Sequence, residues 1–159
     1  LVHGPELLLL DEPTAGVDPK ARREFWDIIH ELAQDGITVL VSTHYMDEAE
    51  RCRELIYIAY GKILARGTQA DIIAGYDLNV WQLSGDAAGW AAGRLASNSA
   101  LSVSAFGNGY HVTAKDEAAL QEAVKGLAIP QDELSLMPIK ASLEDVFIHL
   151  LELYKDERF

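Results

Sequence analysis

The chain has 159 residues, of which 49% are hydrophobic and 24% are charged, and its 25 Asp and Glu against 13 Lys and Arg give a net charge of −12. This length suffices for one ordinary domain or two small ones with a sizeable core. The acidic balance argues against a nucleic-acid partner, because nucleic-acid binding relies on a basic face that displaces counterions. No apolar stretch approaches the roughly 20 residues that span a bilayer.

Two apolar runs near the start of the chain predict buried strands with a helix between them. Leu7–Leu10 is unbroken, which suits a strand covered on both faces, and residues 37–41 are rich in β-branched side chains. Between these runs, Asp18 followed by Pro19 predicts a helix start, and Gly36 is placed to end that helix. The order strand, helix, strand is typical of an α/β layer.

Three further elements are predicted before the middle of the chain: a short helix at residues 46–53, a hairpin around Gly61-Lys62 at residues 55–66, and a helix at residues 68–75. Thr68 is the expected N-cap of the last helix, and Gly75 is expected to close it. A linker follows near residues 75–77. We therefore expect two domains, residues 1–75 and residues 78–159.

The second half of the chain predicts strand, helix, strand, strand, helix and strand over residues 80–139. The middle two strands pair naturally across the turn Gly107-Asn108-Gly109. This order is the split βαβ pattern of ferredoxin-like domains. A final helix is predicted from Ser142, with Asp145 three residues later in a capping-box arrangement. Its apolar stripe must dock on another surface, and covering the small sheet is the simplest role for it.

The candidate functional residues follow the two predicted strands. Asp11 and Glu12 come at the carboxyl end of the first strand, the edge where open α/β sheets bind ligands. Adjacent acids there are costly unless a positive ion such as Mg²⁺ lies nearby. His44 follows the second strand and emerges on the same edge if the strands run parallel. A solvated strand end and a hydrogen-bonded core histidine are the structural alternatives, and Asp18 already has a sufficient role as an N-cap.

Taken together, these residues resemble the nucleotide-binding subunit of ABC transporters. The segment LLLLDEPTAGVDP of this chain is similar to the Walker B strand of that family, together with the catalytic glutamate and the D-loop that follow it. The segment ITVLVSTHYMDEAERC is similar to the strand that carries the switch histidine in the family and to the helix after it. The segment IAYGKILARGT is similar to the hairpin that follows. The resemblance extends from the start of the chain to Thr68.

The resemblance implies a role for each candidate residue. Asp11 would hold Mg²⁺ through its water shell, and Glu12 would orient or deprotonate the water that attacks the γ-phosphate. His44 would contact that phosphate as charge develops. Asp18 would reach across a head-to-tail dimer and couple the two nucleotide sites. The implied cofactors are therefore ATP and Mg²⁺.

Three motifs of the family are missing: the G-x-x-x-x-G-K-[ST] loop, the glutamine loop and the LSGGQ-like signature. In the family they precede the Walker B strand, and LVHGPE is similar to the end of the helix after the signature. We therefore expect a truncated chain: an α/β, partial P-loop NTPase core without its N-terminal half, followed by a small α+β ferredoxin-like accessory domain. Alone, it is expected neither to bind ATP tightly nor to hydrolyse it.

The ending SLEDVFIHLLE resembles, more loosely, the accessory domain of ABC-2-type exporters, including drug and antibiotic efflux systems. This implies an ATP-hydrolysing subunit that powers an exporter on the cytoplasmic face of the plasma (inner) membrane, with a membrane-spanning subunit and a second ATPase subunit as partners. One alternative is a non-enzymatic regulatory or interaction module carried by residues 78–159. Another is a soluble ABC protein of DNA repair or translation, against which the charge and the export-type ending argue.

Overall fold

The structure is a computed structural model that describes residues 4–114, 116–130 and 133–156. The chain separates into two compact units, Leu1–Cys52 and Arg53–Phe159, and each unit is described by itself. The expected helix end at LVHGPE falls in part on residues 1–3, which lie outside the described residues.

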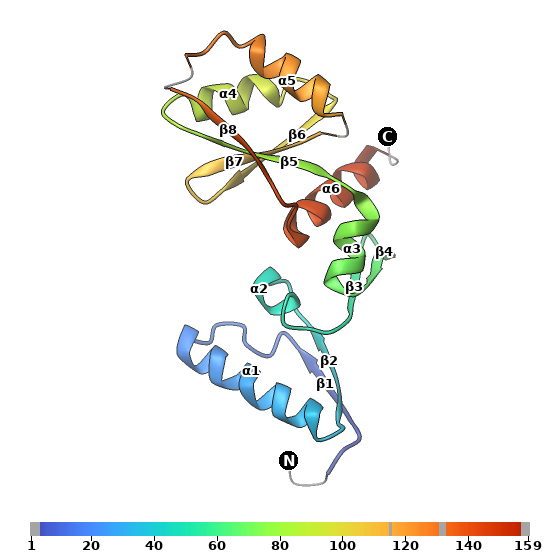
Figure 1. Ribbon diagram of the computed structural model, residues 1–159. Coiled ribbons are helices and arrows are strands. Elements are labelled where there is room, and N and C mark those ends of the chain that lie inside the picture. Colours follow the sequence, from blue (N-terminus) through green and yellow to red (C-terminus); the bar gives the residue numbers. More distant parts are fainter. Residues whose placement is uncertain (1–3, 115, 131–132, 157–159) are drawn as a thin grey trace. The chain divides into compact units, whose positions relative to one another are not determined.

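The first unit is a strand–helix–strand layer (Figure 1). Strands β1 (Leu7–Asp11) and β2 (Thr38–Ser42) run parallel, with Asp11 opposite Ser42, and helix α1 (Pro19–Gln34) connects them. This confirms that both strands end at the same edge. Helix α2 (Met46–Ala49) follows β2 and ends before residue 53, where the sequence pattern placed its end.

One face of the two-stranded sheet is covered, and the other is open. Helix α1 packs on the covered face through Trp26 and Ile29, both buried. Exposed and half-buried side chains alternate along both strands, and Leu9 and Leu40 stay 64% and 59% exposed. The expectation of strands buried on both faces is therefore wrong here, because the described residues of this unit supply a helix to one face only.

The second unit begins with a hairpin and a short helix. Strands β3 (Leu55–Ala59) and β4 (Lys62–Gly67) are antiparallel. The turn residues Tyr60 and Gly61 both have positive φ, as in a type I′ turn, so the turn lies one residue earlier than predicted. Helix α3 (Gln69–Tyr76) begins at the expected N-cap, Thr68, which forms a capping box with Asp71.

A four-stranded antiparallel sheet follows, in the order β6-β7-β5-β8. Its elements are β5 (Asn79–Ser84), α4 (Ala88–Leu95), β6 (Leu101–Phe106), β7 (Gly109–Ala114), α5 (Glu117–Lys125) and β8 (Ser135–Ile139). Helices α4 and α5 cover one face of this sheet (Figure 1). The core beneath them centres on Leu83, Val112 and Leu120, which are fully buried.

Helix α6 (Leu143–Asp156) lies on the opposite face of the sheet from α4 and α5 (Figure 1). The expected capping box is present: the Ser142 N–H donates to Asp145 Oδ2 at 2.8 Å, and the Asp145 N–H donates to Ser142 Oγ at 3.2 Å. The ring of Phe147 stacks on Tyr57 of β3, with 4.0 Å between centroids. The buried stripe of the helix consists of Leu143, Val146, Phe147 and Leu150.

The packing groups the hairpin and α3 with the second unit, because α3 packs on α6 and Tyr57 stacks on Phe147. The sequence pattern instead placed residues 55–75 with the first domain. Packing within one chain need not follow a domain boundary. The boundary at residues 75–78 therefore stays a prediction.

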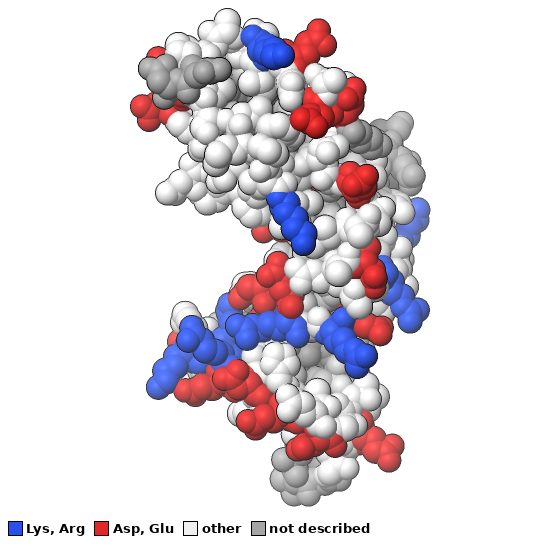
Figure 2. Space-filling model, viewed as in Figure 1, with Lys and Arg blue, Asp and Glu red and all other residues white. Residues whose placement is uncertain are grey.

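The surface carries mixed charge over the first unit. On the face shown in Figure 2, basic and acidic side chains lie among one another over α1. One such pair is Lys20 and Glu24, with 3.8 Å between Nζ and Oε1. Among the residues that the structure describes, no helix is long and apolar enough to cross a membrane.

Candidate functional site

The ends of β1 and β2 are tied together where the candidate site begins. The Ser42 hydroxyl donates a hydrogen bond to Asp11 Oδ1, and the Glu12 N–H donates to the Ser42 carbonyl at 2.9 Å. Glu12 has φ of +43°, a left-handed conformation that non-glycine residues seldom adopt. Such conformations concentrate at functional sites, where the surrounding structure holds them in place.

Glu12 and His44 meet at this edge. Glu12 Oε1 lies 3.1 Å from His44 Nδ1, and the two side chains are 50% and 59% exposed. An exposed pair of this kind contributes at most about 1 kcal/mol to stability, so stability does not account for the arrangement. With Nδ1 directed at Glu12, Nε2 is the ring nitrogen that remains for a ligand. The predicted juxtaposition of the acid and the histidine is therefore present.

Asp18 is placed by its role as a helix cap. Its Oδ1 accepts hydrogen bonds from the N–H groups of Lys20 at 3.0 Å and Ala21 at 3.1 Å, which confirms the predicted N-cap. The side chain is exposed. Within the described residues, its carboxylate contacts the backbone of α1 and neither Glu12 nor His44.

A buried network behind the site was missed by sequence reasoning. Glu48 on α2 is 1% exposed, and the sequence pattern gave it no role. Thr14 Oγ1 donates to Glu48 Oε1, and Thr43 Oγ1 donates to Glu48 Oε2 at 2.7 Å. Arg22 Nε of α1 lies 3.6 Å from Glu48 Oε1. Nothing in the local sequence pattern distinguishes Glu48 from the neighbouring acids Asp47 and Glu50.

A ring contact joins this network to His44. The guanidinium carbon of Arg22 lies 4.6 Å from the centre of the Tyr45 ring, which is cation–π geometry. The Tyr45 and His44 rings are 4.2 Å apart between centroids. The Tyr45 N–H donates to Thr43 Oγ1 at 3.1 Å. The residues on both sides of His44 are therefore anchored.

The donor set at the edge fits a magnesium ion that nucleotide phosphates help to hold. Mg²⁺ is usually bound through one or two carboxylates together with waters and substrate phosphates. Asp11 supplies such a carboxylate, exposed and oriented by Ser42. Within the described ranges, no three His, Cys, Asp or Glu side chains are grouped as a complete metal site.

The thiol of Cys52, which ends the first unit, is half-buried. Burial raises the pKa of the Cys52 thiol, and the charge of Glu48 raises it further. Its Sγ lies 3.7 Å from the Glu48 carbonyl oxygen, which accepts from the thiol. Because the thiolate is the reactive form, the raised pKa disfavours nucleophilic chemistry at this cysteine.

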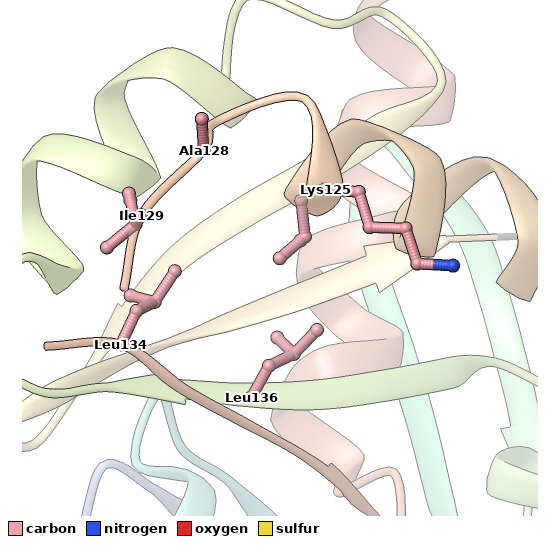
Figure 3. A pocket seen from close by; sticks show the side chains of 6 residues that line it. Lys125, Ala128, Ile129, Leu134 and Leu136 are labelled. Atoms are coloured by element: carbon pink, nitrogen blue, oxygen red, sulfur yellow. The ribbon is translucent and has the colours of Figure 1, made fainter. Parts of the chain in front are cut away.

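A hollow of about 550 Å³ in the second unit does not coincide with this chemistry. It lies between the end of α5 and β8, and its lining residues are Val124, Lys125, Ala128, Ile129, Leu134 and Leu136. The Lys125 amine extends away from the apolar side chains (Figure 3). A binding pocket normally combines an apolar lining with a few convergent polar groups, and the described residues that line this hollow bring no such groups together.

Comparisons with known proteins add a second line of support. A family model described as "AAA domain, putative AbiEii toxin, Type IV TA system" matches residues 1–46. The Escherichia coli "Probable multidrug ABC transporter ATP-binding protein YbhF" is 51% identical over 74 residues, which cover 46% of this chain and 13% of that protein. The Streptomyces peucetius "Daunorubicin/doxorubicin resistance ATP-binding protein DrrA" is 42% identical over 84 residues, or 52% of this chain and 26% of that protein.

A longer match covers nearly the whole chain. The "Nod factor export ATP-binding protein I" of Ralstonia nicotianae is 35% identical over 158 residues, which cover 94% of this chain and 48% of that protein. The chain thus spans less than half the length of each of these relatives. The AAA-type match agrees with the α/β character of the first unit.

Proposed function

Because this chain is homologous to the ATP-binding proteins of ABC transporters, we propose that it is the C-terminal part of an ATP-hydrolysing subunit that powers a membrane exporter. The observation that carries the proposal is the contact of Glu12 with His44 at 3.1 Å, at the edge where two parallel strands end. The complete protein is called the full-length subunit below. The export direction is supported by relatives that are themselves named for export or drug resistance.

In the proposed reaction, each residue at the edge has a separate task. Mg²⁺, when bound with ATP, neutralises charge on the phosphates. Asp11 would hold that ion through water, with its carboxylate oriented by Ser42. Glu12 would orient or deprotonate the attacking water. His44, with Nδ1 held by Glu12, would direct Nε2 at the γ-phosphate and stabilise the charge that develops there.

The partners and location follow from the same proposal. Asp18 would contact a second ATPase subunit across the nucleotide interface while it continues to cap α1. A membrane-spanning subunit would hold the assembly at the cytoplasmic face of the plasma (inner) membrane. The chain alone would be inactive, because its sequence contains no G-x-x-x-x-G-K-[ST] loop to cradle the phosphates.

We also propose that residues 78–159 form a ferredoxin-like accessory domain that follows a partial P-loop NTPase core in the chain. The strand order β6-β7-β5-β8, with α4 and α5 on one face, supports this assignment. The alternative function, a regulatory or interaction module, would need a ligand or partner site in this region. The apolar hollow of Figure 3 lacks converging polar groups, so we favour the transporter role.

A Glu12→Gln substitution in the full-length subunit tests the proposal. Gln keeps the shape of the side chain but cannot accept a proton, so ATP should bind and stay uncleaved. We expect a dimer that persists with ATP and Mg²⁺, detectable by analytical ultracentrifugation, and loss of steady-state turnover. The control is Glu50→Gln, an exposed acid that follows α2. Unchanged turnover in Glu12→Gln would overturn the assignment of the base.

A further inference from the structure

We propose that Glu48 is a positioning residue that sets the separation of Glu12 and His44 by holding the two loops that carry them. The proposal rests on the proposed function, since the site that Glu48 positions is the proposed ATPase site. Glu48 itself does not touch that site. Its carboxylate lies behind it, at 1% exposure, on the inner side of α2.

Both oxygens of the Glu48 carboxylate are used, one for each loop. Oε1 accepts from the hydroxyl of Thr14, which lies two residues after Glu12 and is itself 1% exposed. Oε2 accepts from the hydroxyl of Thr43 at 2.7 Å, immediately before His44. One rigid planar group therefore fixes the loop after β1 against the loop after β2.

The chemistry of position 48 is difficult to explain by packing alone. An apolar side chain would fill the same buried place without desolvation of a charge, whereas a buried carboxylate is costly unless its oxygens are paired. Here the paired groups are two threonine hydroxyls from two separate loops. The hydrogen bonds to Glu48 therefore specify the relative position of the loops, which an apolar contact would leave free to slide.

Arg22 gives a second connection between Glu48 and His44. Its Nε lies 3.6 Å from Glu48 Oε1, and this buried nitrogen has no hydrogen-bond partner among the described residues. The same guanidinium lies over the Tyr45 ring, 4.6 Å from its centre, and Tyr45 contacts the His44 ring. Loss of the Glu48 charge would leave Asp47 as the acidic partner of Arg22, with 3.9 Å between Nη1 and Oδ2, and would shift the guanidinium that lies over the ring beside His44.

The test uses the full-length subunit with Glu48→Gln, Thr14→Val and Thr43→Val. Each substitution preserves shape and removes the charge or one hydroxyl donor. Because a small displacement of reacting groups costs a large factor in rate, we expect kcat to fall roughly tenfold or more while KM for ATP stays within about twofold. Glu50→Gln, an exposed acid two residues along the chain, is the matched control and should leave both unchanged.

Two further readouts separate positioning from a merely structural role. The kcat of each variant should fall at temperatures well below its melting temperature, where circular dichroism shows the variant to be folded. In a background that carries both Glu12→Gln and His44→Ala, Glu48→Gln should cause no further loss of the residual turnover, because neither residue that it positions remains. If Glu48→Gln is too unstable to purify, the two Thr→Val variants decide by the same measurements.

The outcomes distinguish this proposal from the one on which it rests. A wild-type subunit without ATPase activity, or full activity in Glu12→Gln, overturns the proposed function and the role of Glu48 together. Suppose instead that Glu12→Gln loses activity while kcat is unchanged in Glu48→Gln, Thr14→Val and Thr43→Val. That result overturns the positioning role alone. A further loss in that combined variant, or a kcat loss that the unfolded fraction explains, also overturns it.

Discussion

At the scale of single residues, the candidate site combines side chains that the sequence pattern predicts with side chains that it does not. The juxtaposition of Asp11, Glu12 and His44 was predictable because each follows an apolar run, and parallel strands end at one edge. Thr14 and Glu48 were not, because they are 34 residues apart in the chain and neither carries a local signal of burial. Which acid of α2 turns inward depends on where α1 and the loop after β1 lie, which periodicity does not specify.

Asp18 permits a test of two roles at one residue. Asp18→Ala should lower the free energy of unfolding by about 1 kcal/mol, because the N–H groups of Lys20 and Ala21 lose their acceptor. Asp18→Asn should restore most of that loss, since Asn caps helices well. Urea denaturation measures both variants. If Asn fails to recover stability, the cap is not what the carboxylate contributes.

The raised pKa of the Cys52 thiol gives a pH dependence with a definite sign. The folded protein holds the thiol proton more tightly than the unfolded chain. The corresponding stability is therefore present below the ordinary thiol pKa and is lost as the pH rises through the folded value. Alkylation of Cys52, followed by mass spectrometry, should be slower than that of an unfolded control between pH 8 and 9. An equal rate would show that the thiol is not protected.

At the scale of elements, local signals predicted the starts of helices well. Asp18, Thr68 and Ser142 act as capping residues where the sequence placed them, because a cap involves only neighbouring backbone groups. Tertiary packing decided the rest. Helix α2 is a single short turn, and the hairpin turn is displaced by one residue to Tyr60-Gly61. Sequence spacing alone does not fix such details.

The attachment of α6 to the sheet depends on one buried pair. His111 Nδ1 lies 2.8 Å from Asp145 Oδ1, with the side chains 11% and 1% exposed, and Asp145 also caps the helix through Ser142. Asp145→Ala breaks both interactions and should lower the free energy of unfolding by about 3 kcal/mol. Its exposed neighbour gives the control, as Glu144→Gln should change stability by less than about 0.5 kcal/mol. Equal effects of the two variants in urea denaturation would refute the role of the pair.

At the scale of the whole molecule, the uncovered sheet face of the first unit is the feature that the sequence pattern did not predict. Parallel strands are normally covered on both faces, yet Leu9 and Leu40 are largely exposed. The apolar runs correctly predicted two strands, but whether a strand is buried also depends on which elements pack against it. This exposure supports the proposal of a partial ATPase core, whose open face other parts of the full-length subunit would cover.

The measurement that tests the central claim most directly is the single-turnover cleavage of bound ATP by the full-length subunit with His44→Ala. Rapid-quench analysis after preincubation with ATP and addition of Mg²⁺ reports the chemical step separately from nucleotide binding. Our account predicts a rate at least about a hundredfold below wild type, with ATP affinity nearly unchanged, because His44 would act on charge that develops in the transition state. A wild-type rate of cleavage in this variant would contradict the account.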